Sequence, residues 1–224
     1  MRGDNIRRAL EDEGLPPEEI ERIVADHVED VDLAARAAIA GVPAIYRTLT
    51  WESIIEEEAN AEAIAAGRSW AAGESKANGL FLWSEGYGAG KTMIAAAAVL
   101  QILTSRPLRV RWLDCSRLLT DLNLPFGNPQ YEAAAAALSR PKNGEVIVLD
   151  DIDKLPATDR NIQPIFTLVN DCVGEETPPI ITANRHLDAL ADDFGRRFGG
   201  AIASRLVGHC LDVEVAGRDR RLEP

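Results

Sequence analysis

The sequence predicts an α/β fold in which a five-stranded parallel sheet carries helices on both faces. Three observations lead to this prediction. Five short apolar runs are separated by segments of helical character, which is typical of parallel strands joined by helices. The first run leads into a glycine-rich turn and then an alanine-rich helix. Hydrophobic residues make up 46% of the 224 residues and charged residues 27%, as expected of a folded globular protein.

Acidic residues are concentrated in the N-terminal part of the chain. Residues 1–66 hold 6 basic and 16 acidic residues, whereas the rest of the chain holds 18 and 20. The formal net charge of −12 argues against a protein that coats duplex DNA by charge alone. The acidic part indicates either a basic protein partner or a solvated surface, and composition alone does not choose between them.

The N-terminal region, residues 1–40, is expected to form short helices with the potential to dock on a partner. Apolar side chains recur at helical spacing between Ile20 and Val31. They follow a turn at residues 14–17, where proline is suited to the first helical positions. This stretch is therefore expected to be a small helical extension of the main fold.

A connecting segment, residues 41–78, follows where Gly41-Val42-Pro43 breaks the helical pattern. Thr50 is expected to cap a helix over residues 51–66, which Gly67 would end. The core of the fold then occupies residues 79–224. Its strands are expected at residues 79–84, 108–113, 145–150, 179–183 and 209–215.

A phosphate-binding loop is predicted at residues 86–92, which read Gly86-Tyr87-Gly88-Ala89-Gly90-Lys91-Thr92. They follow an apolar strand and begin a helix, which is the context that such a loop requires. Glycines let backbone N–H groups surround phosphate oxygens, and the helix N-terminus adds partial positive charge. Lys91 would reach the β- and γ-phosphates of a nucleoside triphosphate, and the Thr92 hydroxyl would ligate Mg²⁺.

One position departs from the usual G-x-x-x-x-G-K-T pattern, because Glu85 stands where the first glycine falls. A carboxylate that faced the triphosphate would repel it. The position lies at the end of a strand, so the side chain is expected to face away and nucleotide binding to survive. The alternative is a weakened or inactive nucleotide site.

Two carboxylates, Asp150 and Asp151, follow the third apolar run. Beside a phosphate-binding loop, Asp150 is expected to hold Mg²⁺ through water and Asp151 to act as general base on the attacking water. Asp153, a third acid nearby, is interpreted as a loop or cap residue. The simpler alternative is that the two acids only cap the following loop.

Two side chains later in the chain are suited to sensing the nucleotide. Asn184 follows the fourth run, where its amide would lie beside the γ-phosphate and orient the water, unless it is a plain turn residue. Arg205 lies on a helix predicted over residues 196–206. It would stabilise the γ-phosphate of a neighbouring subunit, or else form an ordinary surface ion pair. Arg196 and Arg197 would serve DNA, a subunit interface or a solvated face.

Several further motifs accompany this order of loop, acidic pair, strand-end Asn and late Arg. They are Gly41-Val42-Pro43 with Tyr46-Arg47 and Leu49-Thr50-Trp51, Gly79-Leu80-Phe81-Leu82, Asp114-Cys115-Ser116-Arg117-Leu118-Leu119, Thr182-Ala183-Asn184, and Phe194-Gly195 through Ser204-Arg205-Leu206. The ordered set resembles the AAA+ ATPases, which are P-loop NTPases. Over residues 41–215 the chain is similar to the DnaC/DnaI-type helicase loaders and the related IstB transposition ATPases.

The resemblance implies roles for the same residues. Lys91, Thr92 and Asp150 would bind ATP with Mg²⁺, Asp151 would activate water, Asn184 would be sensor 1, and Arg205 would be an arginine finger. A finger that acts on a neighbour implies self-association into a ring or spiral. Only 19 residues follow Arg205, which implies a reduced or absent helical lid and leaves no sensor-2 arginine assigned.

The function that the resemblance implies is ATP-dependent loading of the replicative DNA helicase during initiation of DNA replication. Residues 1–40 would dock on the hexameric helicase, and the core would bind single-stranded DNA. ATP hydrolysis would be slow or regulated by the partner or DNA.

Other functions remain open. An IstB-type transposition helper ATPase is the first alternative, although those relatives usually carry a more basic N-terminal DNA-binding segment. The second alternative is a regulatory module that binds nucleotide without turnover. Glu85, at the first glycine position of the loop, is the observation that suggests it. A small-molecule P-loop kinase would need an acceptor pocket and a basic lid, and the sequence shows neither.

The cysteines Cys115, Cys172 and Cys210 match no metal-binding or disulfide spacing. They are expected to be buried thiols in a reducing cytosol. The chain shows no basic-then-apolar targeting signal, and its longest apolar run, residues 93–103, is too short to span a bilayer. The sequence therefore predicts a cytoplasmic protein without a membrane partner.

Overall fold

The centre of the structure is a parallel sheet whose strands lie in the order β2-β3-β4-β1-β5. The strands are β1 Gly79–Trp83, β2 Arg109–Asp114, β3 Glu145–Asp150, β4 Pro179–Ala183 and β5 Cys210–Glu214. Every strand that the sequence predicts is present, and no limit differs by more than one residue. The predicted α/β fold, with a five-stranded parallel sheet, is confirmed.

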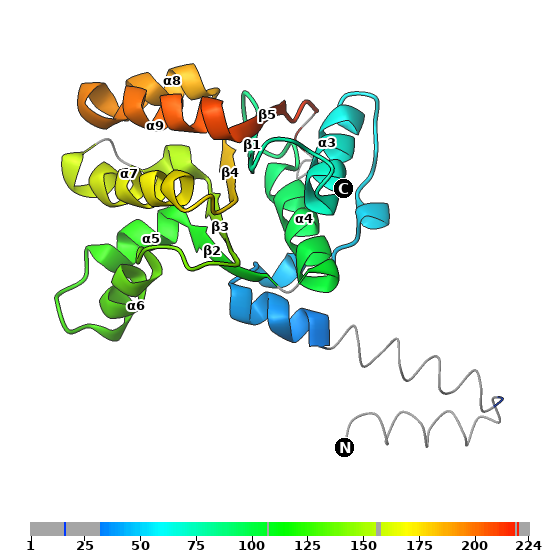
Figure 1. Ribbon diagram of the computed structural model, residues 1–224, viewed down its shortest axis with the longest axis horizontal. Helices are drawn as coiled ribbons and strands as arrows, with labels where there is room; N and C mark the ends of the chain where they lie inside the picture. The colour runs from blue at the N-terminus through cyan, green and yellow to red at the C-terminus, as the bar shows by residue number, and fades with distance from the viewer. Residues whose placement is uncertain (1–15, 17–31, 107, 156–157, 218, 220–224) are drawn as a thin grey trace.

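The protein is described from a computed structural model, which covers residues 16, 32–106, 108–155, 158–217 and 219 (Figure 1). The helices predicted within residues 1–31 lie outside these described residues, and residues 32–40 form a helix. The later helices are α3 Ala61–Ala72, α4 Lys91–Ser105, α5 Cys115–Leu122, α6 Pro129–Ala137, α7 Asp159–Gly174, α8 Leu187–Asp193 and α9 Gly195–His209. Single turns of 3-10 helix form at η1 Ala44–Tyr46, η2 Trp51–Ser53 and η3 Ile152–Lys154.

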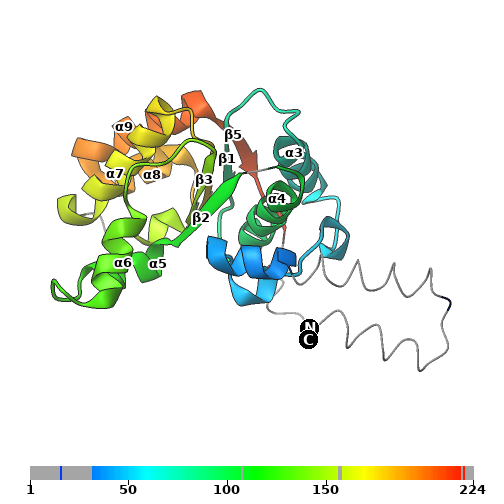
Figure 2. The same ribbon diagram turned by 60° about the horizontal axis from the view of Figure 1, so that its bottom comes forward.

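The sheet separates two apolar cores, and Figures 1 and 2 show helices on both of its faces. Helices α3 and α4 and the helix of residues 32–40 supply one core, and α5, α7, α8 and α9 supply the other. Alternate strand residues point to opposite faces, so Val146 and Val148 join the first core while Ile147 and Leu149 join the second. Every residue of β3 and β4 is buried, as expected of inner strands covered on both faces.

The helix predicted over residues 51–66 is wrong in both of its limits. Thr50 does act as a cap, but its hydroxyl and the Ser53 hydroxyl close a capping box around the single turn η2. The chain then runs without helix to Asn60, whose buried amide accepts from the Glu57 N–H and donates to the Ile55 carbonyl. Helix α3 begins only after this loop.

Gly67 lies inside α3 rather than at its end, because α3 and α4 approach closely there. A Cβ at Gly67 would fall 2.8 Å from Cγ2 of Ile94 on α4. The helix ends instead at Gly73, which has a φ of 82° and whose N–H bonds to the carbonyls of Ser69 and Trp70. A glycine at a helix crossing therefore looks like a helix stop in the sequence.

All three cysteines are buried and free, as the sequence predicts. Within the described residues, no helix is both long enough and apolar enough to cross a membrane.

Helices α8 and α9 pack so closely that one glycine has no room for a side chain. A Cβ at Gly199 would fall 1.9 Å from the carbonyl oxygen of Ala191 on α8, whereas a Cβ at the exposed Gly200 would meet nothing within 4 Å. Backbone cannot move aside as the end of a flexible side chain can. The two adjacent glycines thus have different roles on one helix.

We predict that Gly199→Ala lowers the free energy of unfolding by roughly 2–4 kcal/mol, because the added methyl forces α8 and α9 apart. Gly200→Ala is the matched control and should raise stability by about 0.5–1 kcal/mol, since alanine is the better helix former. Urea denaturation followed by circular dichroism measures both variants. Equal effects of the two substitutions would contradict the close contact.

Candidate functional site

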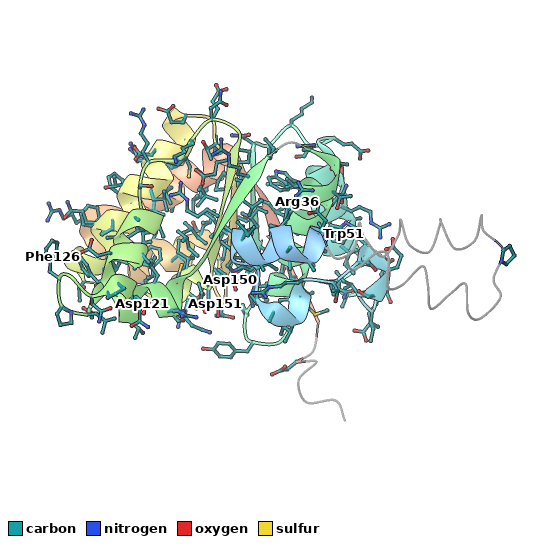
Figure 3. All side chains as sticks on the ribbon, turned by 90° about the horizontal axis from the view of Figure 1, so that it is seen from below. Arg36, Trp51, Asp121, Phe126, Asp150 and Asp151 are labelled. Carbon is teal, nitrogen blue, oxygen red and sulfur yellow. The ribbon has the colours of Figure 1, made fainter. Side chains whose placement is uncertain are left out.

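The phosphate-binding loop, the start of α4 and the ends of β3 and β4 together form a pocket of about 210 Å³. In open α/β sheets, ligands bind in such a crevice outside the carboxyl ends of the strands. The pocket is lined by Tyr46, Tyr87, Gly88, Gly90, Lys91, Thr92, Met93, Asp151, Lys154 and Asn184. Seen from below (Figure 3), Asp150 and Asp151 lie near the middle of the molecule, whereas Phe126 lies at its far edge.

The backbone of the phosphate-binding loop adopts a conformation that glycine alone adopts readily. Gly86, Gly88 and Gly90 have φ values of 121°, 79° and 101°. A Cβ at Gly86 or Gly90 would meet nothing within 4 Å, so open space borders the backbone at both positions. The loop then runs directly into α4, whose N-cap is Gly90. These are the features that a phosphate group needs to approach main-chain N–H groups.

Lys91 is the buried cation of the pocket, with only 5% of its surface exposed. Its Nζ donates to Ser84 Oγ at 2.5 Å, to the Gly86 carbonyl at 3.0 Å and to Asn184 Oδ1 at 3.0 Å. Burying an ammonium group costs free energy unless oxygen atoms surround it, and these three oxygens do so. They come from the end of β1, the loop and the end of β4.

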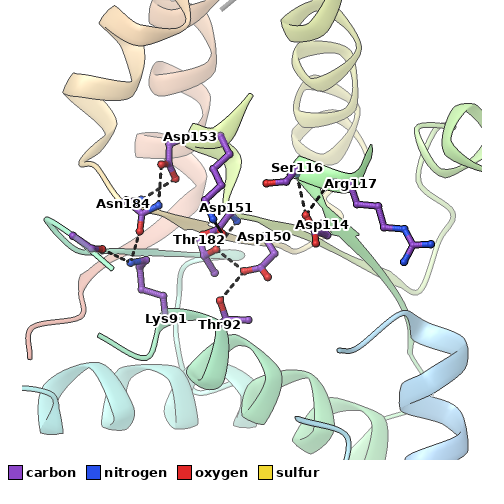
Figure 4. A network of polar contacts seen from close by, with 12 residues as sticks. Lys91, Thr92, Asp114, Ser116, Arg117, Asp150, Asp151, Asp153, Thr182 and Asn184 are labelled. Carbon is purple, nitrogen blue, oxygen red and sulfur yellow. Dashed lines mark hydrogen bonds and ion pairs between the residues drawn. The ribbon is translucent and has the colours of Figure 1, made fainter. Parts of the chain in front are cut away.

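Asp150 links three elements through a single carboxylate oxygen (Figure 4). Its Oδ1 accepts from Thr182 Oγ1 on β4 at 2.7 Å and from Thr92 Oγ1 on α4 at 3.1 Å. Burial is the main cause that raises the pKa of Asp150 from 3.8 to about 6, while the hydrogen bond from Thr182 opposes the rise. The Thr92 hydroxyl and this carboxylate are hard oxygen ligands of the kind that Mg²⁺ prefers.

Asp151 lines the pocket directly, and its backbone is held in a constrained conformation. Its φ of 56° lies in the left-handed region, and its N–H donates to Thr182 Oγ1 at 2.8 Å. Lys154 Nζ lies 2.5 Å from Asp151 Oδ2. The carboxylate thus lies beside the phosphate-binding loop with a lysine as its partner.

Asn184 is oriented by Asp153, which the sequence analysis interpreted as a loop or cap residue. Asp153 accepts from the Asn184 backbone N–H at 2.8 Å and from its Nδ2 at 2.9 Å. This pair of bonds turns the Asn184 Oδ1 toward Lys91. Asp153 therefore positions the amide.

Glu85 and Arg205 both lie outside the lining of this pocket. Glu85 is exposed and borders a neighbouring pocket of about 400 Å³, as expected of a side chain that faces away. Arg205 is held on α9 by Asn170 Oδ1 at 2.9 Å and by the Ala201 carbonyl at 3.0 Å. Its guanidinium lies 5.0 Å from the centre of the Phe166 ring.

Most of the other residues predicted for the phosphate-binding loop lie at this pocket or its neighbour. Tyr87, Gly88, Gly90, Lys91 and Thr92 line the pocket, Gly86 lines the neighbouring one, and Ala89 is buried in the core beneath the loop. Arg197 lies beside the Phe198 ring on α9, and the side chain of Arg196 is outside the described part.

Three residues that line the pocket are not among those that the sequence predicts for it: Tyr46, Met93 and Lys154. Met93 directly follows Thr92, and Lys154 stands three residues after Asp151, so local spacing could have indicated both. Tyr46 is brought to the pocket because its segment is fastened to α4: Trp51 Nε1 donates to Gln101 Oε1 at 2.7 Å. A contact between residues so distant in the chain is not readable from local pattern.

Comparison with known proteins identifies the family. The profile of the IstB-like ATP binding protein family matches residues 33–224. The chain belongs to this family. Its members are described as ATP-binding proteins, and the match confirms the resemblance to the DnaC/DnaI-type, IstB-like branch. The predicted P-loop NTPase fold is the one that the chain shares with the DnaI and DnaC structures.

Individual relatives are distant in sequence. The replication initiator DnaA of Neisseria meningitidis serogroup C is 22% identical over 178 residues, which are 78% of this chain and 34% of that protein. The chain thus spans about a third of the length of the curated relatives that it matches.

Solved structures share the fold. The DnaI structure has a TM-score of 0.63 at 18% identity and covers 80% of this chain and 94% of its own. The DnaC helicase loader has a TM-score of 0.60 at 20% identity and covers 77% and 99%. A DnaA bound to AMPPCP and single-stranded DNA has a TM-score of 0.60 at 20% identity and covers 77% and 50%.

We predict that Asp150→Asn stabilises the free protein at neutral pH. The folded state raises the pKa of Asp150 to about 6, so its ionisation opposes folding above about pH 6 and has no effect below about pH 4. An Asn Oδ1 still accepts from Thr92 and Thr182. The gain should be roughly 1–3 kcal/mol at pH 7.5 and near zero at about pH 4.

Urea denaturation at both pH values, without Mg²⁺ or nucleotide, measures this gain. Glu58→Gln, at an exposed carboxylate, is the matched control. Equal stabilisation at both pH values would contradict the prediction.

Proposed function

We propose that this pocket binds ATP with Mg²⁺ and hydrolyses the terminal phosphate. The observation that carries the proposal is the meeting of Lys91, the Thr92–Asp150 pair and Asn184 at one glycine-rich loop. The open space at Gly86 and Gly90 fits phosphate oxygens. At Gly88 the Asp219 carboxylate occupies the corresponding space.

The chain's own residues divide the work of binding and chemistry. The loop and Lys91 hold the β- and γ-phosphates, and Thr92 with Asp150 holds Mg²⁺, which when bound supplies charge neutralisation on the phosphates. Asp151 accepts a proton from the attacking water, and Asn184 orients that water. The half-buried Tyr46 and Met93 offer apolar surface at the same pocket, which suits the base.

Arg205 enters this scheme only through a second copy of the chain. It lies on α9 and does not line the pocket of its own chain. An arginine supplied to a neighbour's γ-phosphate stabilises charge in the transition state, which requires self-association into a ring or spiral. We therefore include Arg205 as a finger acting between subunits.

We further propose that the ATPase loads the replicative hexameric DNA helicase onto single-stranded DNA. The fold shared with 99% of the chain in the DnaC helicase loader structure supports this, as does the fold shared with a DnaA bound to single-stranded DNA. Residues 1–40 are the proposed docking region, and their acidic composition is suited to a basic surface. The site of action is the cytoplasm.

The family match also favours a second function, that of an IstB-type transposition helper ATPase. A native pull-down of the tagged protein with ATP distinguishes the two. Recovery of the replicative helicase supports the loader, and recovery of a transposase supports the helper. Turnover that is absent with and without single-stranded DNA would favour a regulatory module that only binds nucleotide.

We predict that Lys91→Ala weakens binding of a fluorescent ATP analogue by at least about 50-fold, because the variant loses the buried charge that faces the phosphates. Phosphate release should fall to background. Lys76→Ala, which removes an exposed lysine away from the pocket, is the control and should bind as the wild type does. Unchanged binding in Lys91→Ala would refute the nucleotide site.

We also predict that removing residues 1–31 abolishes co-purification with the helicase while leaving ATP binding intact. The truncation stops before the helix of residues 32–40, because Ala37 and Ala40 are buried in the core. Size-exclusion chromatography with purified helicase gives the measurement. A truncated protein that still co-elutes would place the docking surface elsewhere.

A further inference from the structure

A second lysine stands at the pocket, outside the roles given so far. Lys154 ends the turn η3 and lines the same pocket as Lys91. Its Nζ lies 2.5 Å from Asp151 Oδ2 and 5.8 Å from the centre of the Tyr87 ring in the phosphate-binding loop. The amine is therefore placed between the proposed general base and the loop that would hold the phosphates.

The two lysines differ in how firmly they are held. Lys91 is buried among oxygens of three elements, whereas 39% of the Lys154 side chain is exposed. Ion pairs that reach solvent contribute only about 0–1 kcal/mol, so the Lys154–Asp151 contact is easily exchanged for a stronger one. A lysine amine on its flexible stem can move without rearranging the backbone.

Asp151, in contrast, is fixed through its backbone. Its N–H is bonded to Thr182 Oγ1, and its φ of 56° holds the residue in the left-handed region. The main chain of Asp151 is therefore held in place, and the longer Lys154 side chain has more bonds about which it can move. The hydrogen bond to Asp151 also raises the pKa of Lys154 above its ordinary value.

We propose that Lys154 is a second phosphate-contacting lysine, which leaves Asp151 for the terminal phosphate of bound ATP. This inference rests on the proposed ATPase function and deepens it. The terminal phosphate of ATP carries more negative charge than one carboxylate and competes for the amine. The exchange adds a positive charge where the transition state needs it and frees the Asp151 carboxylate to accept a proton.

The exchange makes the site discriminate between ATP and ADP. ADP lacks the terminal phosphate, so with ADP bound Lys154 stays on Asp151. With the amine on Asp151, the face of the Tyr87 ring also attracts it through a cation–π contact at the edge of the pocket. One side chain would thus report the presence of the γ-phosphate to the base that activates the attacking water.

The first test is Lys154→Met in the full chain, with Lys154→Arg as the conservative variant. The Kd for a non-hydrolysable ATP analogue should rise by about 5–20-fold in Lys154→Met, while the Kd for ADP should change by less than about twofold. Turnover should fall by at least about tenfold, and Lys154→Arg should retain most of it. The inference would be overturned if Lys154→Met kept the wild-type ratio between the Kd for the ATP analogue and the Kd for ADP, or if it turned ATP over faster than wild type.

A double-mutant cycle tests the exchange itself. In Asp151→Asn the Lys154 amine does not have to break an ion pair before it contacts the phosphate. The ATP analogue should therefore bind about 2–5-fold more tightly than to wild type. In Lys154→Met the same Asp151→Asn change should give a clearly smaller gain, which comes only from the lost repulsion between the carboxylate and the phosphates. Equal gains in both backgrounds would show that Lys154 does not move to the phosphate.

The Lys91→Ala variant separates this inference from the function on which it rests. If wild type binds neither nucleotide, the proposed ATP site itself is wrong. If wild type binds and Lys91→Ala does not, while Lys154→Met keeps the wild-type ratio, only the role of Lys154 is wrong.

Discussion

The carboxylate of Asp150 ties together the parts of the fold on which the site depends. It ends an inner strand, β3, and receives hydrogen bonds from Thr182 on the adjacent β4 and from Thr92 at the start of α4. Burial makes its ionisation costly, as the raised pKa shows. The fold therefore keeps an ionisable group that lowers the stability of the free protein, at a place where a bound divalent cation would offset its negative charge. Functional sites commonly reduce stability in this way.

Much of the architecture is readable from local pattern, because inner parallel strands are continuous apolar runs. The limits of β3 and β4 agree with the sequence prediction to the residue, since both strands are buried throughout. The segment around α3 is not readable in this way. Gly67 resembles a helix stop, and only the approach of Ile94 from α4 shows that it marks a helix crossing instead.

The same distinction between local pattern and tertiary contact applies to the residues of the candidate site. Lys91, Thr92, Asp151 and Asn184 meet at one pocket as the order of motifs predicts, because the carboxyl ends of parallel strands share one edge. Tyr46 and the bonds from Asn184 to Asp153 depend on tertiary contacts that carry no local signal. The roles of Arg205 and residues 1–40 depend on other molecules, so neither the sequence nor one chain of the structure decides them.

The close contact between α8 and α9 has a mechanical consequence. Asn184 is separated from α8 by two residues, and α8 leads into α9, which carries Arg205. Because the Gly199 backbone packs directly against the Ala191 backbone, the two helices have little room to move relative to each other at this contact. A change in the position of Asn184 would then reach Arg205 as the motion of one rigid arm. In the proposed ring, the chemical state of one pocket would in this way set the reach of the side chain offered to the next.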